Sequence, residues 1–322
     1  MNDAICAWCE APRQTGPVCP RCGADYAKAA AIKAHGKAEI KTVAEESVEE
    51  PALEIEEPVI PVNDPAFECL VCLVSMPSML FIAWLVQVTG FLKGMQRIFF
   101  GMPVHEFGHA VSAWLCGFNA IPALWKTITP ENRGYISSAL LLVAQVALSR
   151  YAIKHKQPAW FIGIAMVFLV QVYGTFVITL SKADMFITLG GDALGLVLSA
   201  LLMSLFYVGK DTQIYKGALR YGFLGIGAAA FMDMFLPWWK KDISAIGYGL
   251  TGGIPTDSWK MVNIHLWEWE SLFSMHFTIG ILCLLALITI YALGIRQANL
   301  WLREKQRHDR LEQLRKASVQ HG

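Results

Sequence analysis

The sequence predicts an all-α polytopic membrane protein with about six to seven transmembrane helices and a small N-terminal zinc ribbon. Its 322 residues are 55% hydrophobic and only 16% charged, and the mean hydropathy is +0.42, which is far more apolar than a soluble chain of this length. Apolar runs follow one another after residue 67, and most reach the roughly 20 residues that cross a bilayer. Only the N-terminus departs from this pattern, because it is polar and rich in cysteine.

Two C-x-x-C pairs define the N-terminal unit, residues 1–27. Cys6 with Cys9 and Cys19 with Cys22 are separated by nine residues, the spacing of a zinc ribbon in which four thiolates hold one structural ion. Such a short fold needs the metal for stability, and its thiolates need a reducing compartment. No basic region leads into an apolar core at the N-terminus, so we expect no signal peptide and a cytoplasmic ribbon. The ribbon lacks a basic stripe with interleaved aromatics, which favours protein docking over nucleic-acid binding.

The net charge of +1 conceals a strong segregation of charge along the chain. Residues 28–66 form a predicted linker, which is first rich in Ala and Lys and then, from residue 42, rich in Glu and Pro. Such a segment buries too little apolar surface to pack a core, so we expect a semi-extended tether. The C-terminal tail, residues 297–322, is basic and is therefore predicted to be cytoplasmic.

Seven apolar spans make up the predicted membrane domain, residues 67–296. They lie near 70–92, 98–118, 135–150, 159–180, 186–208, 219–238 and 272–295. A cytoplasmic N-terminus and a cytoplasmic tail require an even number of crossings. Because the third span is short, we expect it to be re-entrant, which leaves six crossings.

The second span contains the motif His105-Glu106-Phe107-Gly108-His109. Two histidines four residues apart lie on one face of a helix, so both imidazoles can bind one zinc ion. Glu106 lies about 100° further round the helix, where it can reach a water on the metal as a general base. Three ionisable side chains within an apolar span are costly, and one metal with its water satisfies all three. The motif therefore predicts a catalytic zinc centre.

A catalytic zinc needs a third protein ligand and an open position for water. Two carboxylates in later apolar spans, Asp192 and Asp233, are the candidates. The glycines that flank Asp192 allow its helix to approach the face around Gly108 closely, as a short aspartate side chain requires. We therefore expect Asp192 to be the third ligand and keep Asp233 as the alternative.

The motif His105-Glu106-Phe107-Gly108-His109, followed by Trp114-Leu115-Cys116-Gly117, resembles the active-site helix of the site-2 protease family of intramembrane zinc metalloproteases. In that family an Asp in a later span, usually in Leu-Asp-Gly after Asn-x-x-Pro, completes the zinc site. Asp192 follows His109 by 83 residues, similar to compact members of the family. It stands, however, in Gly-Gly-Asp-Ala-Leu-Gly, and no Asn-x-x-Pro precedes it. The resemblance covers about a third of the chain and supports the assignments of His105, Glu106 and His109.

These features predict a zinc metalloendopeptidase with one catalytic and one structural Zn²⁺. Its expected substrates are membrane-embedded or membrane-proximal segments of other proteins, and its expected location is the bacterial inner membrane. The alternative is a zinc-binding membrane adaptor or metal-handling protein without catalytic activity. Glu106 separates the two, because only a peptidase needs it as a base.

Overall fold

The computed structural model describes residues 6, 12, 15–22, 24–27, 64–154, 158–210, 212–251 and 253–320. The chain divides into two compact units, Met1–Ile60 and Pro61–Gly322. Most of the predicted acidic linker, residues 28–63, lies outside the described residues. The second unit contains the membrane domain and the tail, which one helix joins without a break at residue 296.

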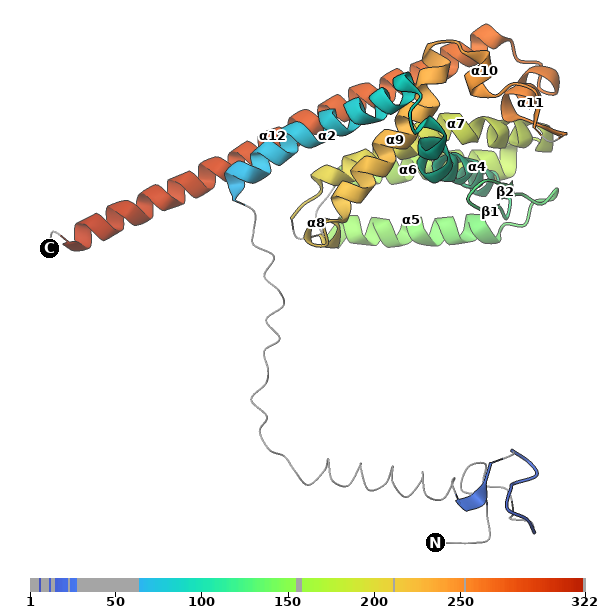
Figure 1. Cartoon of the computed structure of the whole chain (residues 1–322), viewed down its shortest axis with the longest axis horizontal. Coiled ribbons are helices and arrows are strands. Elements are labelled where there is room, and N and C mark those ends of the chain that lie inside the picture. The colour runs from blue at the N-terminus through green and yellow to red at the C-terminus, as the bar shows by residue number, and fades with distance from the viewer. Residues whose placement is uncertain are drawn as a thin grey trace. The chain divides into compact units, whose positions relative to one another are not determined.

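The second unit is almost entirely helical (Figure 1). In chain order its elements are α2 (Pro65–Thr89), α3 (Lys93–Gln96), the π-helix η1 (Arg97–Gly101), α4 (Met102–Leu115), β1 (Ile121–Pro122), β2 (Thr127–Ile128), α5 (Ile136–Lys154), α6 (Pro158–Val172), the π-helix η2 (Tyr173–Val177), α7 (Leu180–Ser204), the 3₁₀-helix η3 (Leu205–Tyr207), α8 (Gln213–Lys216), α9 (Leu219–Trp239), α10 (Ile243–Ile246), β3 (Leu250–Thr251), β4 (Ile254–Pro255), α11 (Asp257–Asn263) and α12 (Trp269–Gln320). The strands form two short antiparallel hairpins, β1–β2 and β3–β4.

Six helices in the described part of the chain are long and apolar enough to cross a membrane. They are Pro65–Thr89, Ile136–Lys154, Trp160–Val177, Leu180–Tyr207, Leu219–Trp239 and Trp269–Lys316. The number agrees with the sequence prediction, but the assignment of the short element was wrong. The span near 135–150 forms a 19-residue helix, α5, whereas the span near 98–118 contains α4, which has only 14 residues. Helix α4 continues α3 and η1 without a break, so the His-Glu-x-x-His motif lies in the helical stretch 93–115, which is not among the six long apolar helices.

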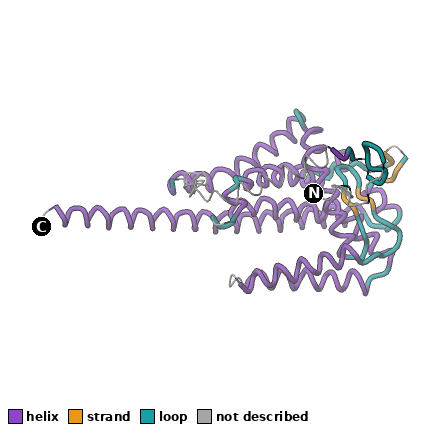
Figure 2. Tube along the Cα trace, turned by 90° about the horizontal axis from the view of Figure 1, so that it is seen from below, coloured by secondary structure: helices purple, strands orange, loops and turns teal. Residues whose placement is uncertain are grey.

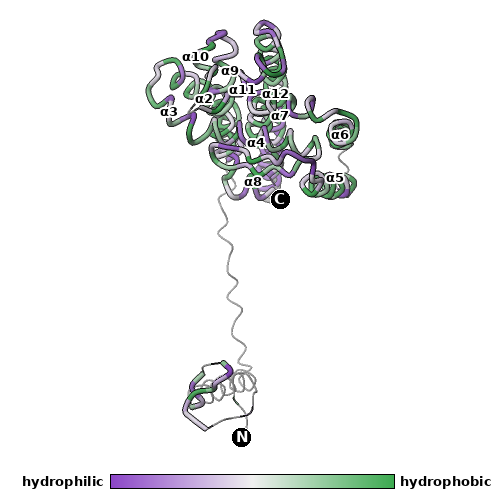
Figure 3. The backbone as a smooth tube through the Cα atoms, turned by 90° about the vertical axis from the view of Figure 1, so that its right-hand side faces the viewer, coloured by the Kyte–Doolittle hydropathy of each residue, from purple (hydrophilic) through white to green (hydrophobic). Residues whose placement is uncertain are grey.

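The helices run side by side, and their connections gather at two ends of the bundle (Figures 1 and 2). The two β-hairpins, α10 and α11 lie at one end, and α8 lies at the other. The α5–α6 hairpin stands to one side and is hydrophobic over much of its length (Figure 3). The main core is formed by apolar side chains of α2, α7, α9 and α12, including Leu196, Met203, Leu224 and Phe231.

Glycines allow α4 and α7 to pack with their backbones in contact, as the sequence predicted. A Cβ atom placed on Gly108 would overlap the carbonyl oxygen of Gly190, and one placed on Gly190 would overlap the Ser112 hydroxyl. A Cβ atom on Gly191 would lie 2.6 Å from Nε2 of His109. Small residues permit this close approach between apolar helices. It brings α7 directly against the face of α4 that carries both histidines.

We expect Gly108→Ala to lower the free energy of unfolding by about 1–3 kcal/mol, because the added methyl meets backbone that cannot rotate away. Gly163→Ala is the matched control, since a Cβ atom at Gly163 in α6 meets nothing within 4 Å. That substitution should leave stability unchanged or raise it by about 0.5–1 kcal/mol through helix propensity. Thermal unfolding of the detergent-solubilised proteins measures both changes. Equal effects of the two substitutions would contradict the proposed backbone contact.

Candidate metal centre

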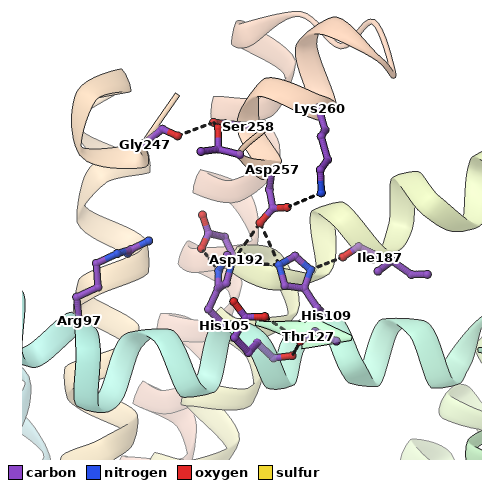
Figure 4. A network of polar contacts seen from close by, with 12 residues as sticks. Arg97, His105, His109, Thr127, Ile187, Asp192, Gly247, Asp257, Ser258 and Lys260 are labelled. Carbon is purple, nitrogen blue, oxygen red and sulfur yellow. Dashed lines mark hydrogen bonds and ion pairs between the residues drawn. The ribbon is translucent and has the colours of Figure 1, made fainter. Parts of the chain in front are cut away.

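Three side chains from two parts of the chain converge on one point. His105 and His109 come from α4, and Asp257 is the first residue of α11. The Nε2 atoms of the two histidines are 3.1 Å apart, and Oδ2 of Asp257 lies 3.2 Å from the first and 3.0 Å from the second. In the described residues, two groups have ligand atoms close enough together to hold a metal ion. One is His105, His109 and Asp257, and the other is Cys6, Cys19 and Cys22. Figure 4 shows the convergence.

Hydrogen bonds at the opposite ring nitrogens fix the tautomers of both histidines. Nδ1 of His109 lies 2.6 Å from the carbonyl oxygen of Ile187, which can only accept a hydrogen bond. Nδ1 of His105 lies 2.8 Å from Oδ1 of Asp192. In its neutral form, which metal binding requires, each imidazole therefore carries its proton on Nδ1 and presents a lone pair at Nε2. This pattern of outer hydrogen bonds is typical of metal-binding histidines.

With both rings neutral, two Nε2 lone pairs and one carboxylate oxygen face one another. Three acceptors so close together repel unless a cation lies between them. Zinc bonds of 2.0–2.2 Å in a tetrahedron place neighbouring ligand atoms about 3.3 Å apart, close to the spacings of 3.0–3.2 Å found here. The residues present therefore fit a zinc ion, with a fourth position for water.

Asp257 belongs to a cap that covers the histidines, residues 243–268, made of α10, the β3–β4 hairpin and α11. Met261, one turn further along α11, is buried in an apolar cluster with Leu189 of α7 and Trp238 of α9. This packing fixes α11 over the histidines. Burial alone would raise the pKa of Asp257, but positive charge at this point outweighs burial, and with His109 and His105 protonated this pKa lies well below its usual range. The carboxylate is therefore ionised at neutral pH, as a metal ligand must be.

The structure corrects the predicted third ligand, because Asp192 reaches the wrong nitrogen of His105. The backbone of α7 at Gly191 lies against the facing edges of the two imidazoles. The side chain of Asp192, the next residue, reaches Nδ1 of His105 and accepts a hydrogen bond of 2.9 Å from Nε1 of Trp238. Asp192 thus orients a ligand and is not placed to be one itself.

Asp233, the alternative third ligand, is also placed elsewhere. Its side chain is buried and paired with Arg97 of η1 at 3.0 Å and with Gln87 of α2 at 3.1 Å. This ion pair joins α9 to η1, the π-helix that leads into α4. Sequence reasoning missed Asp257 because that residue lies outside the apolar spans. Only its position after Thr256 at a helix start is visible in the sequence, and acidic residues are common there without any metal.

Glu106 is buried on α4 beside the β1–β2 hairpin. The hydroxyl of Thr127 in β2 lies 2.8 Å from Oε2 of Glu106 and 2.7 Å from its carbonyl oxygen. The strand therefore holds the carboxylate in one orientation. Thr127 is a second positioning residue, and no sequence pattern singles it out.

In the N-terminal unit, Cys6, Cys19 and Cys22 lie close enough to share a metal ion. Cys6 and Cys19 are buried with Tyr26, and the amide of Cys19 donates a 2.9 Å hydrogen bond to the carbonyl oxygen of Ala24. Cys9, the fourth predicted ligand, lies outside the described residues. A four-cysteine zinc ribbon stays a prediction.

The chain matches no protein-family model, and searches of curated proteins and of solved structures found no match.

We expect Asp257→Ala to remove zinc from the membrane site, because two histidines alone are a weak chelate. Asp192→Ala should weaken binding by about 10–100-fold, the usual effect of losing an outer hydrogen bond to a ligand. Glu268→Gln, on an exposed position of the same cap, is the control and should bind zinc as the parent does. Zinc titration in a background with the four N-terminal cysteines changed to Ser measures this site alone. Full zinc binding by Asp257→Ala, with loss in Asp192→Ala, would restore the original assignment.

Proposed function

We propose that this protein is a membrane-embedded zinc metalloendopeptidase. The observation that carries the proposal is the convergence of His105, His109 and Asp257, with Glu106 next to the first ligand on the same helix. A structural zinc site closes its coordination with four protein ligands, whereas a catalytic site has three and leaves one position to water. The three-ligand set found here supports the catalytic alternative.

Zinc bound at such a site lowers the pKa of a coordinated water to about 7 and polarises a carbonyl oxygen. His105, His109 and Asp257 would hold the ion, while Asp192 and the Ile187 carbonyl keep both imidazoles in the required tautomer. Glu106 takes the proton of the attacking water as the new C–O bond forms. It then returns that proton to the amide nitrogen as the C–N bond breaks. Thr127 engages Oε2 of Glu106, so we assign the proton transfer to Oε1.

The membrane setting limits the substrates that such a site can use. A peptide bond within a transmembrane helix is already hydrogen-bonded, so a substrate must unwind locally before its carbonyl can be attacked. Water must also reach the site, and the side chain of Asp257 is 32% exposed. These features support substrates that are membrane-embedded or membrane-proximal protein segments, with the bilayer as the surrounding medium.

Glu106→Gln should retain zinc and lower peptide-bond cleavage by about 10²–10⁴-fold, because the amide cannot accept the proton. Glu131→Gln, an exposed substitution in the loop after the β1–β2 hairpin, is the matched control and should cleave at the parent rate. The assay compares purified variants on a panel of single-span membrane substrates in liposomes, with zinc content measured on the same samples. Cleavage by Glu106→Gln at the parent rate would refute the proposed mechanism.

The alternative is a zinc-binding membrane adaptor or metal-handling protein that catalyses no reaction. One observation favours this alternative: Thr127 gives the Glu106 carboxylate a structural hydrogen-bond partner. A parent protein that binds zinc at the membrane site yet cleaves no member of the panel would favour this alternative.

A further inference from the structure

We propose that the metal centre opens toward the non-cytoplasmic side of the membrane and lies close to that membrane face. If the peptidase proposal holds, its substrates are then cut near the non-cytoplasmic ends of their membrane spans. The orientation rests on the path of the chain and the distribution of charge. Only the substrate part rests on the proposed function.

The path of the chain defines two faces of the membrane domain. The start of α2 and the projecting part of α12 lie at one face, because Asp64 and Lys305 form an ion pair of 3.3 Å. Helix α8 and the α5–α6 connection lie toward the same face, which we name the tail face (Figure 1). The β-hairpins, α10 and α11 lie at the opposite face, which we name the cap face.

The six long helices run alternately toward the cap face and toward the tail face. Helix α2 runs from the tail face to the cap face, and α5, α6, α7, α9 and α12 then alternate, so that α12 returns to the tail face. Helix α4 lies between the end of α2 and the start of α5, which are both at the cap face. It therefore enters and leaves the membrane domain from that face without crossing. Six crossings place both ends of this unit at the tail face.

Charge identifies the tail face as cytoplasmic. Residues 296–316 of α12 contain seven Lys or Arg and three Asp or Glu. The two short connections at this face are basic as well, with Lys154 at one and Lys210 and Lys216 at the other. At the cap face, the segment 240–268, which includes the cap, has three residues of each sign, and the segment 90–135 has four Lys or Arg and two Asp or Glu, so neither is as basic as the α12 tail. Lys and Arg accumulate in short cytoplasmic loops, so the cap face is the non-cytoplasmic one. The chain before α2 then begins in the cytoplasm, where thiolates stay reduced.

The metal centre lies in the half of the membrane domain next to the cap face. Asp192 follows the exposed Asp184 of α7 by eight residues, or about 12 Å along the helix, and buried His276 follows the exposed Glu270 of α12 by six, or about 9 Å. Trp238, which contacts Asp192, is two residues from Lys240. Half of a hydrocarbon core is about 15 Å, and helix tilt shortens these depths further. The ligand Asp257 lies outside the long helices altogether.

This placement determines which peptide bonds can reach the site. A bond near the cytoplasmic face would have to move by roughly 15 Å or more toward the cap face, because it starts in the opposite half of the hydrocarbon core. When the bond lies within about two helical turns of the non-cytoplasmic end, only the frayed end of the substrate helix has to unwind, and water is present there. The substrates should therefore be spans with weak helix propensity at their non-cytoplasmic ends.

Cysteine accessibility in spheroplasts tests the orientation without using zinc or cleavage. Ser244→Cys introduces a thiol on exposed α10, and Gln306→Cys introduces one on the exposed part of α12. The parent, with its own eight cysteines, gives the background. A membrane-impermeant maleimide should label Ser244→Cys above background in intact spheroplasts, and Gln306→Cys only after permeabilisation. The reverse pattern, or the same behaviour of both variants, would overturn the proposed orientation.

Two single-span substrates in the same cells test the substrate part. They carry one identical helix-breaking segment, placed in the third of the span next to either the non-cytoplasmic or the cytoplasmic face. Cleavage of the first alone, and its loss in Glu106→Gln, would support the proposal. Preferential cleavage of the second, or equal cleavage of both, would overturn it. Failure to cleave either would contradict the peptidase proposal, while the labelling result would still decide the orientation.

Discussion

The close contact between α4 and α7 is the constraint on which the candidate site depends. Side chains normally keep packed helices 8–10 Å apart, and at that distance a residue on α7 would not reach the outer nitrogens of imidazoles on α4. Glycine at 108, 190 and 191 removes the side chains from the interface, so that backbone packs on backbone. The carbonyl of Ile187 and the carboxylate of Asp192 then reach the two Nδ1 atoms.

These two hydrogen bonds decide what the histidines can do. An imidazole on a membrane helix can be a donor, an acceptor or a cation, and its surroundings select among these states. An acceptor at each Nδ1 leaves a lone pair at each Nε2, and Asp257 adds a third acceptor. Trp238 supports this arrangement from a distance, because it donates to Asp192 and stacks on buried His276 with ring centroids 3.8 Å apart. The polar groups around the site therefore form a supporting network in a largely apolar domain.

The third acceptor, Asp257, comes from the cap and not from the packed pair of helices. The histidines belong to a rigid pair of packed helices, whereas Asp257 belongs to a short helix held mainly by apolar contacts of Met261 with Leu189 and Trp238. A metal bound by all three residues would join the cap to the membrane helices, and the binding energy would add to the stability of the closed cap. Ligand binding and closure of the site are coupled in such an arrangement.

The sequence by itself determined the membrane class, the number of long helices and the pair of histidines, because hydropathy and helical spacing are local properties. It also indicated the close helix contact, since glycines flank Asp192 and Gly108 lies within the motif. It favoured Asp192 over Asp233 and did not select Asp257, because a residue outside the apolar spans reaches the histidines only through the way the cap folds back over α4. Nor could it show that α5 is one of the six long apolar helices while the stretch that carries the motif is not. Those points depend on how distant segments pack, and only the tertiary structure decided them.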